Sequence, residues 1–255
     1  MLLTVKGIVL RETNAGDKGR FIDILTEEMG VAEVYVRGAK KVTGKSTGIT
    51  QLFSYAEFCI EQKGDRYYYQ SGKPVRIFYG LRENLLNLSL ASYFAELLRT
   101  AVPKDSSSKE ILRLTLNTLH FLAEGTRSPE VLKPLFELRL ASELGFMPDV
   151  LMCRRCMAHL PENIVFSAEE GCFWCSDCYK EDNTENPAAY PMSKAGLEMV
   201  RFITLVETER LFSFRVNDKT LEAVSVFAEG YIRHHLGVNL KTLEFWRSIR
   251  HNGII

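Results

Sequence analysis

Residues 52–62 read LFSYAEFCIEQ, with apolar and polar side chains in alternation, and residues 67–77 repeat the alternation more loosely. A period of two places successive side chains on opposite faces of a β-strand. Between the two segments lies Lys63-Gly64-Asp65, whose composition is typical of a hairpin turn. These residues therefore predict a β-hairpin with one buried and one exposed face.

Three shorter segments before the hairpin are rich in Val, Ile, Leu, Phe and Tyr: residues 4–11, 20–27 and 31–37. Polar or glycine-containing turns separate them. Five short strands without intervening helices favour a small closed sheet. We expect a five-stranded OB-fold β-barrel over residues 1–80, and a six-stranded SH3-like barrel is the nearest alternative.

The hydrophobic period changes near residue 81. Leucines and aromatic residues recur at helical spacing over residues 85–98 and again over residues 111–122. A third helix has Pro134 at or near its start and ends at Gly145, and two more cover residues 193–202 and 221–236. We therefore expect an α+β multidomain protein, with a helical domain formed by residues 81–146 and 190–255 and a cysteine-rich module inserted at residues 147–189.

The inserted module contains two C-x-x-C pairs separated by eighteen residues: Cys153, Cys156, Cys175 and Cys178. This spacing is typical of a four-thiolate zinc site, because each tight turn presents two sulfur atoms to one ion. Four thiolates fill a tetrahedral coordination sphere and leave no position for an activated water. The pattern therefore predicts one structural zinc ion.

Two other residues compete for the ligand positions. Cys172-x-x-Cys175 is also an acceptable pair, and His159 lies shortly after Cys156. We prefer Cys175 with Cys178, and leave open whether Cys172 or His159 can substitute.

Net charge is zero over the chain, but it is unevenly distributed. Residues 1–80 carry 12 basic and 9 acidic side chains, whereas residues 147–189 carry 3 basic and 8 acidic ones. No acidic residue lies between Glu33 and Glu57, and this stretch holds four cations: Arg37, Lys40, Lys41 and Lys45. Cations on a glycine-rich loop suit contacts with nucleic-acid phosphates. We predict that these four residues bind DNA and that the acidic module does not.

Aromatic residues in the barrel segments can stack on unpaired bases: Tyr35, Phe53, Tyr55 and the tyrosines at positions 67–69. Alternate strand positions must, however, point into the core. We expect most of these rings to be core residues.

The sequence contains no phosphate-binding glycine loop, dinucleotide-binding motif or nucleophile elbow. We therefore expect a protein that is not an enzyme and has no catalytic residues. It also contains no apolar run of eighteen residues and no signal-peptide pattern at its start. These features lead us to expect a cytoplasmic protein without a membrane partner.

Several short motifs occur in a characteristic order: Val5-Lys6-Gly7-Ile8-Val9-Leu10, Asp17-Lys18-Gly19-Arg20, Val36-Arg37-Gly38-Ala39-Lys40-Lys41, Phe136-Glu137-Leu138-Arg139-Leu140, Leu144-Gly145-Phe146-Met147-Pro148, His235-Leu236-Gly237 and Leu240-Lys241-Thr242. Together they resemble the bacterial RecO recombination-mediator family over the whole chain. One departure is Cys172, which occupies the second glycine position of that family's Gly-Gly-x-x-Cys-x-x-Cys turn. It supports Cys175 and Cys178 as the ligands.

The resemblance implies a recombination mediator in DNA repair that binds single- and double-stranded DNA and anneals complementary strands. It further implies cooperation with RecR, contact with the tail of single-strand-binding protein, and indirect action on RecA at the bacterial nucleoid. One alternative is a zinc-containing interaction scaffold whose acidic module docks a basic partner, with DNA contact incidental. A hydrolase or deaminase would instead require an open metal position.

Overall fold

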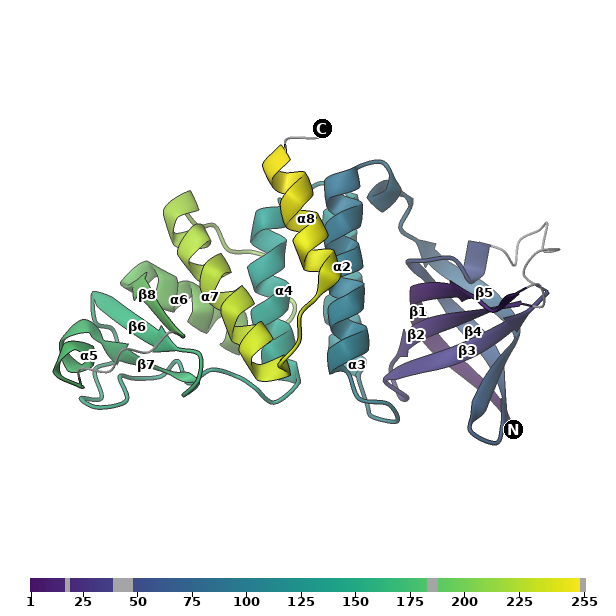
Figure 1. Cartoon of the computed structure of the whole chain (residues 1–255), viewed down its shortest axis with the longest axis horizontal. Coiled ribbons are helices and arrows are strands. Elements are labelled where there is room, and N and C mark those ends of the chain that lie inside the picture. The colour runs from purple at the N-terminus through teal and green to yellow at the C-terminus, as the bar shows by residue number, and fades with distance from the viewer. Residues whose placement is uncertain (17–18, 39–47, 183–187, 253–255) are drawn as a thin grey trace. The chain divides into compact units, whose positions relative to one another are not determined.

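The computed structural model describes residues 1–16, 19–38, 48–182 and 188–252 (Figure 1). The chain forms two compact units, one of Met1–Thr126 with Leu240–Ile255 and the other of Arg127–Asn239. This division differs from the expected one, which assigned all the long helices to one domain apart from the barrel. The reason is that the helices after the barrel pack on different partners, as described below.

In the described residues, the first unit begins with a closed barrel of five strands: β1 (Leu2–Asn14), β2 (Gly19–Thr26), β3 (Val31–Arg37), β4 (Ser54–Lys63) and β5 (Arg66–Ile77). The strand order is β1-β2-β3-β5-β4, and β1 pairs with both β2 and β4 to close the ring. All neighbours are antiparallel except β3 and β5. The predicted five-stranded barrel is confirmed.

The interior of the barrel consists of aliphatic side chains and one phenylalanine that alternate with outward residues along the strands. Val9, Ile24, Val34, Phe58 and Ile60 are each 0% exposed. Burial of each such side chain contributes about 1.5–3 kcal/mol. The period-two pattern of the sequence therefore reports directly on this core.

A short 3₁₀ helix, η2 (Tyr79–Arg82), leads from the barrel to α2 (Leu85–Ala101) and α3 (Lys109–Ala123). Asn84 caps α2 by accepting a hydrogen bond from the Asn87 amide at 3.1 Å. The last helix, α8 (Lys241–Asn252), packs against α2. Glu96 of α2 accepts hydrogen bonds from the amide and hydroxyl of Thr242, which anchors the start of α8. The sequence patterns did not predict α8.

The loop between α2 and α3 is hydrogen-bonded to the turn between β2 and β3. The Asp105 amide donates to the Met29 carbonyl at 2.9 Å, and the Ser108 amide donates to the Glu27 carbonyl at 2.7 Å. Gly30 makes this approach possible, because its φ is +62° and an added Cβ would lie 2.0 Å from the Pro103 carbonyl oxygen. This glycine therefore joins the helices of the first unit to its barrel.

The second unit combines three long helices with a small sheet. The helices are α4 (Pro129–Glu143), α6 (Lys194–Leu205) and α7 (Asp218–Leu236). The sheet has the order β7-β6-β8, with β6 (Asn163–Ser167), β7 (Cys172–Cys175) and β8 (Ala189–Ser193), and the short α5 (Ser176–Asp182) follows β7. The patterns described in the sequence did not predict β8 or α5.

Helix α4 begins earlier than expected. Pro129, not Pro134, occupies its start, where the missing amide hydrogen would have had no partner in any case. Pro134 lies inside the helix and is buried. Beside it, the buried Lys133 ammonium lies 2.8 Å from Glu137 and 2.9 Å from Glu229 of α7. A buried cation of this kind requires such carboxylate partners, which fix α4 against α7.

Among the described helices, we find none with the length and apolar character needed to cross a membrane.

Replacing Gly30 with Ala should lower the free energy of unfolding by about 3 kcal/mol or more, because the methyl group meets Pro103 as well as a left-handed backbone. Gly64→Ala is the matched control, since Gly64 also has a positive φ but has no atom within 4 Å of its Cβ position. The control should cost about 1–2 kcal/mol. Urea unfolding of both variants measures the difference, and equal losses would contradict the proposed role of the loop contact.

Candidate metal centre and nucleic-acid interface

Four cysteine sulfur atoms of the second unit converge on one point. The ligand atoms of Cys153, Cys156, Cys175 and Cys178 all lie within 4.8 Å of one another. Cys153 and Cys156 lie in the loop after α4, whereas Cys175 ends β7 and Cys178 lies in α5. The structure thus brings together the four residues that the spacing singles out, and this cluster can hold a metal ion.

The thiols in the cluster do not ionise equally. Burial opposes ionisation of Cys153, but backbone hydrogen bonds from Cys156, Cys175 and Arg155 outweigh it and lower the pKa of this thiol to about 6. A hydrogen bond with Cys175, followed by burial, raises the pKa of Cys178 to about 12. Adjacent thiolates repel one another, so a cation is needed before all four can lose their protons.

Contacts from outside the cluster hold its first pair of cysteines in place. Arg201 of α6 donates to the carbonyl oxygens of Val150 at 2.6 Å and Leu151 at 2.7 Å, and also to that of His159. The Arg154 amide donates to the Phe173 carbonyl at 3.0 Å, which joins the same loop to β7. Both ends of the first knuckle are therefore fixed to secondary structure.

The two alternative ligands lie outside the cluster. Cys172 is 3% exposed, and its thiol contacts the Glu170 carboxylate with a sulfur–oxygen distance of 3.6 Å. Burial, followed by the charge of Glu170, raises the pKa of Cys172 to about 12. His159 is exposed, and its Nδ1 lies 2.8 Å from the Leu151 carbonyl oxygen. Each of the two side chains thus has a different partner.

The predicted DNA-binding cations fall partly outside the described residues. Lys40, Lys41 and Lys45 lie in residues 39–47, which the structure does not describe. Arg37 ends β3 and is exposed. Its guanidinium carbon lies 5.7 Å from the centre of the Tyr68 ring, a distance at which a cation and an aromatic face attract each other.

Tyr68 belongs to a group of three rings on the outside of the barrel, which we call the aromatic face: Phe21, Tyr35 and Tyr68. The centres of Phe21 and Tyr35 are 5.1 Å apart, and those of Tyr35 and Tyr68 are 6.0 Å apart with nearly perpendicular planes. Lys63 adds a second cation, 5.9 Å from the Tyr68 ring centre. Three neighbouring rings thus come from β2, β3 and β5, and one cation from β3 and one from β4 lie near the Tyr68 ring.

The other aromatic residues of the barrel segments are buried or partly buried, and most pack in or against the barrel core. Tyr67 and Tyr69 pack against the buried residues of the barrel, and burial raises the pKa of Tyr69. Phe53 is 2% exposed, and Tyr55 is half-buried. Sequence reasoning missed Phe21 and Lys63, because only the pairing of β2 with β3 and of β4 with β5 places them beside Tyr35 and Tyr68.

A cavity of about 640 Å³ borders the aromatic face. The three rings line it together with residues of the β2–β3 turn, the β4–β5 hairpin and the α2–α3 loop. The lining carries charges of both signs: the cations are Arg66 and Lys104, and the carboxylates are Glu33, Asp65 and Asp105. The cavity therefore offers ring surfaces and hydrogen-bonding groups. Beside it, Arg37 and Lys63 lie near the Tyr68 ring, and Lys63 also pairs with Glu61 at 3.0 Å.

Two family models cover nearly the whole chain. "Recombination protein O N terminal" matches residues 1–78, and "Recombination protein O C terminal" matches residues 82–244. The chain belongs to the RecO family. The boundary between the two matches falls where the barrel ends and the helices begin.

Curated RecO relatives resemble the chain along its full length. The DNA repair protein RecO of Acetivibrio thermocellus is 28% identical over 97% of both chains. The corresponding protein of Bacillus pumilus is 28% identical over 96% of this chain and 93% of its own. That of Caldicellulosiruptor saccharolyticus is 24% identical over 97% of this chain and 99% of its own. Membership of the family supports a role in DNA repair and recombination.

Cys153→Ser should lose most of the bound metal, because three thiolates and a hydroxyl form a weaker site than four thiolates. Cys172→Ser is the matched control, since the Cys172 thiol donates a hydrogen bond to Glu170 and lies outside the cluster. Elemental analysis of the purified proteins gives the metal content per chain. A loss in Cys172→Ser as large as that in Cys153→Ser would contradict the ligand assignment.

Proposed function

We propose that this RecO-family protein is a DNA-binding recombination mediator that anneals complementary strands. It binds single- and double-stranded DNA and helps to load the recombinase on gaps coated with single-strand-binding protein. Its partners in this role are RecR, the tail of single-strand-binding protein and, indirectly, RecA. The observation that carries the proposal is the aromatic face with Arg37 and Lys63 at its border, in a chain that belongs to a DNA repair family.

The chemistry of this face suits an unpaired strand. Aromatic rings accept the flat faces of bases without regard to their identity, and each stacked base contributes about 1–3 kcal/mol. Arg37, together with Lys40, Lys41 and Lys45, supplies charge for the phosphates. Contacts of this kind do not read base edges, so two strands held near the protein remain free to search for their register.

Annealing also requires that the repulsion between two phosphate backbones be reduced. A cluster of cations lowers this repulsion by replacing condensed counterions. None of these steps makes or breaks a covalent bond, so the protein acts without catalysis. The mixed charge of the cavity lining agrees with transient rather than tight engagement of bases.

We further propose that the cysteine cluster holds one structural zinc ion. A tetrahedral site with zinc–sulfur bonds of about 2.3 Å requires sulfur atoms about 3.8 Å apart. The sulfur atoms of Cys156 and Cys175 lie 3.7 Å apart, which fits this geometry. The donor set is also the one that zinc favours at structural sites. The ion would give the loop around Arg154 a stable shape.

Tyr68→Ala should weaken binding to single-stranded DNA by about 1–3 kcal/mol, because one stacking surface is lost. Tyr79→Ala is the matched control, since Tyr79 is an exposed tyrosine of the same unit away from the aromatic face. Fluorescence anisotropy with a labelled oligonucleotide measures both affinities. Equal affinities of the Tyr68→Ala protein and the unmodified protein would remove the aromatic face from the interface.

The annealing role itself is tested with complementary strands coated with single-strand-binding protein. The unmodified protein should accelerate annealing, and Lys40→Ala with Lys41→Ala should slow it. In direct binding the double variant should reduce the slope of log affinity against log salt by about 1.4, since each single-strand phosphate contact contributes about 0.7. Lys194→Ala with Lys219→Ala removes the same charge from the second unit and should leave the slope unchanged. No acceleration by the unmodified protein would contradict the proposed function.

A further inference from the structure

The cavity beside the aromatic face includes residues from outside the barrel. Its volume of about 640 Å³ lies within the range of about 300–1,000 Å³ that small-molecule sites occupy. Lys104 and Asp105 of the α2–α3 loop line it together with the three rings, and all of its lining residues belong to the first unit. The cavity can therefore enclose part of a ligand, whereas the rings alone offer only a surface.

The part of the cavity that the α2–α3 loop supplies is held in place by backbone contacts. Lys104 forms a short antiparallel bridge with Gly30, and the Asp105 amide donates to the Met29 carbonyl. Asp105 has a φ of +55° although it is not glycine. Such a conformation persists only where the surroundings determine it. A ligand that meets this loop therefore loses little free energy in ordering it.

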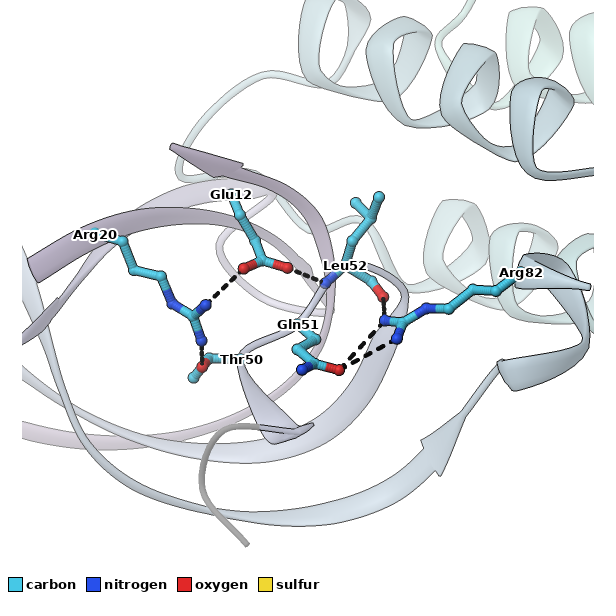
Figure 2. Close-up of polar contacts among 6 residues, drawn as sticks. All are labelled: Glu12, Arg20, Thr50, Gln51, Leu52 and Arg82. Atoms are coloured by element: carbon cyan, nitrogen blue, oxygen red, sulfur yellow. Dashed lines mark hydrogen bonds and ion pairs between the residues drawn. The ribbon is translucent and has the colours of Figure 1, made fainter. Parts of the chain in front are cut away.

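The carboxylates of the cavity have acceptor atoms to spare. By contrast, Figure 2 shows a carboxylate of the same barrel that is fully engaged: the two oxygens of Glu12 accept from the Leu52 amide and the Arg20 guanidinium, each at 2.6 Å. Within the described part of the chain, no ion pair or hydrogen bond engages the side chains of Asp65 and Asp105. These two carboxylates are therefore available to a ligand.

The charges of the lining favour a base over a phosphate as the occupant. Two cations face three carboxylates, so the lining carries a net negative charge that repels a phosphate group. A neutral base meets no such repulsion, and the rings provide stacking surface for it. Unpaired bases are commonly held in this way, with one face stacked and the Watson–Crick edge hydrogen-bonded.

Carboxylates accept hydrogen bonds and cannot donate them, so they select among bases. Cytosine, adenine and guanine each carry an exocyclic amino group that donates to a carboxylate, and cytosine with Asp or Glu is a recognised pairing. Thymine has no amino group and presents a carbonyl oxygen at the corresponding position. That oxygen would face the carboxylate oxygens without a hydrogen between them. Arg66 and Lys104 can donate to the acceptor atom that lies beside the amino group.

We propose that the cavity takes one unstacked base of a single strand and selects bases with an exocyclic amino group over thymine. Asp65 and Asp105 are the main acceptors, and Glu33 assists them although it also lies 4.0 Å from Arg11. The inference rests on the proposed DNA-binding function and adds a preference that ring stacking and phosphate contacts do not supply. Because these carboxylates are exposed, water competes for them and the preference should be modest.

Two homopolymers of equal length test the selection, one of thymidine and one of 5-methyldeoxycytidine. Their bases have the same shape and methyl group and differ in the amino group and the neighbouring ring proton. The unmodified protein should bind the 5-methylcytosine strand about fivefold more tightly. Competition measured by fluorescence anisotropy gives the ratio of affinities. The ratio should not change with salt, because both strands present the same phosphates.

A cavity variant removes all three carboxylates and keeps the shape of the side chains. Amides donate as well as accept, so the ratio should fall to within about twofold of unity. The changes are Glu33→Gln, Asp65→Asn and Asp105→Asn. A control variant removes the same charge from exposed positions of the first unit that do not line the cavity: Glu28→Gln, Glu83→Gln and Glu244→Gln. Both variants should bind each strand more tightly, but only the cavity variant should lose the preference.

Equal affinities of the unmodified protein for the two strands would overturn the inference, and so would a preference that survives in the cavity variant. Thermal unfolding shows whether each variant folds. If the cavity variant does not, Asp65→Asn with Asp105→Asn is used instead, since asparagine tolerates a positive φ. An unchanged ratio in that folded protein would refute the role of the cavity. Failure to bind either strand would refute the proposed function itself, whereas tight and equal binding would refute only the selection.

Discussion

Strands β3 and β5 pair in parallel through Val34 with Tyr67 and Tyr35 with Tyr68, and this short contact closes the barrel. A closed sheet has no free edge, so the five strands need no further partner to satisfy their backbone groups. The same contact places Tyr35 against Tyr68. Because a slip of one residue exchanges the two faces of a strand, a different register would bury Tyr68 and expose Tyr67 and Tyr69. The aromatic face is therefore a consequence of how the barrel closes.

Two sets of polar contacts add to the apolar core of the first unit. Gly30 lets the α2–α3 loop approach the β2–β3 turn, which brings Lys104 to the rim of the cavity. Glu12 and Arg20 hold the stretch that ends at Phe53. Both sets of contacts include hydrogen bonds between segments that are distant in sequence. Both also depend on the position of β2, which the core packing determines. The core packing thus sets the position of β2, and the polar contacts then fix the neighbouring segments.

In the second unit, the cysteine cluster joins segments that are distant in sequence. Its first knuckle lies in a loop and relies on Arg201 and on hydrogen bonds to β7 for its shape. The net negative charge of residues 147–189 separates this unit chemically from the cation-bearing barrel. Under the proposed function, the cluster would stabilise its module and the barrel would supply the surface that meets DNA.

Local patterns predicted the elements whose hydrophobic period is regular. The five strands agree with the alternation in the sequence within a few residues, and α2 begins at the Asn84 cap. Helix α8 escaped prediction because its buried residues, Leu243, Trp246 and Ile249, are few and lie among charged ones. Its anchor, Glu96, is 146 residues away from Thr242. Strand β8 is five residues long, contains a proline and pairs only with β6 among the described strands.

Patterns in the sequence are enough to predict the barrel strands, helices α2, α3, α4, α6 and α7, the grouping of the four cysteines and the resemblance to the RecO family. These features depend on the periodicity of side chains and on residues close together in the sequence, so they can be recognised without the structure. The tertiary structure alone decided which tyrosine faces outward, that Cys172 turns to Glu170, and that Glu12 meets Arg20 and Leu52. The physical reason is that alternation fits either face of a strand equally well. Only the free energy of closing the whole barrel, with its core filled, selects one register and so brings residues 40 positions apart into contact.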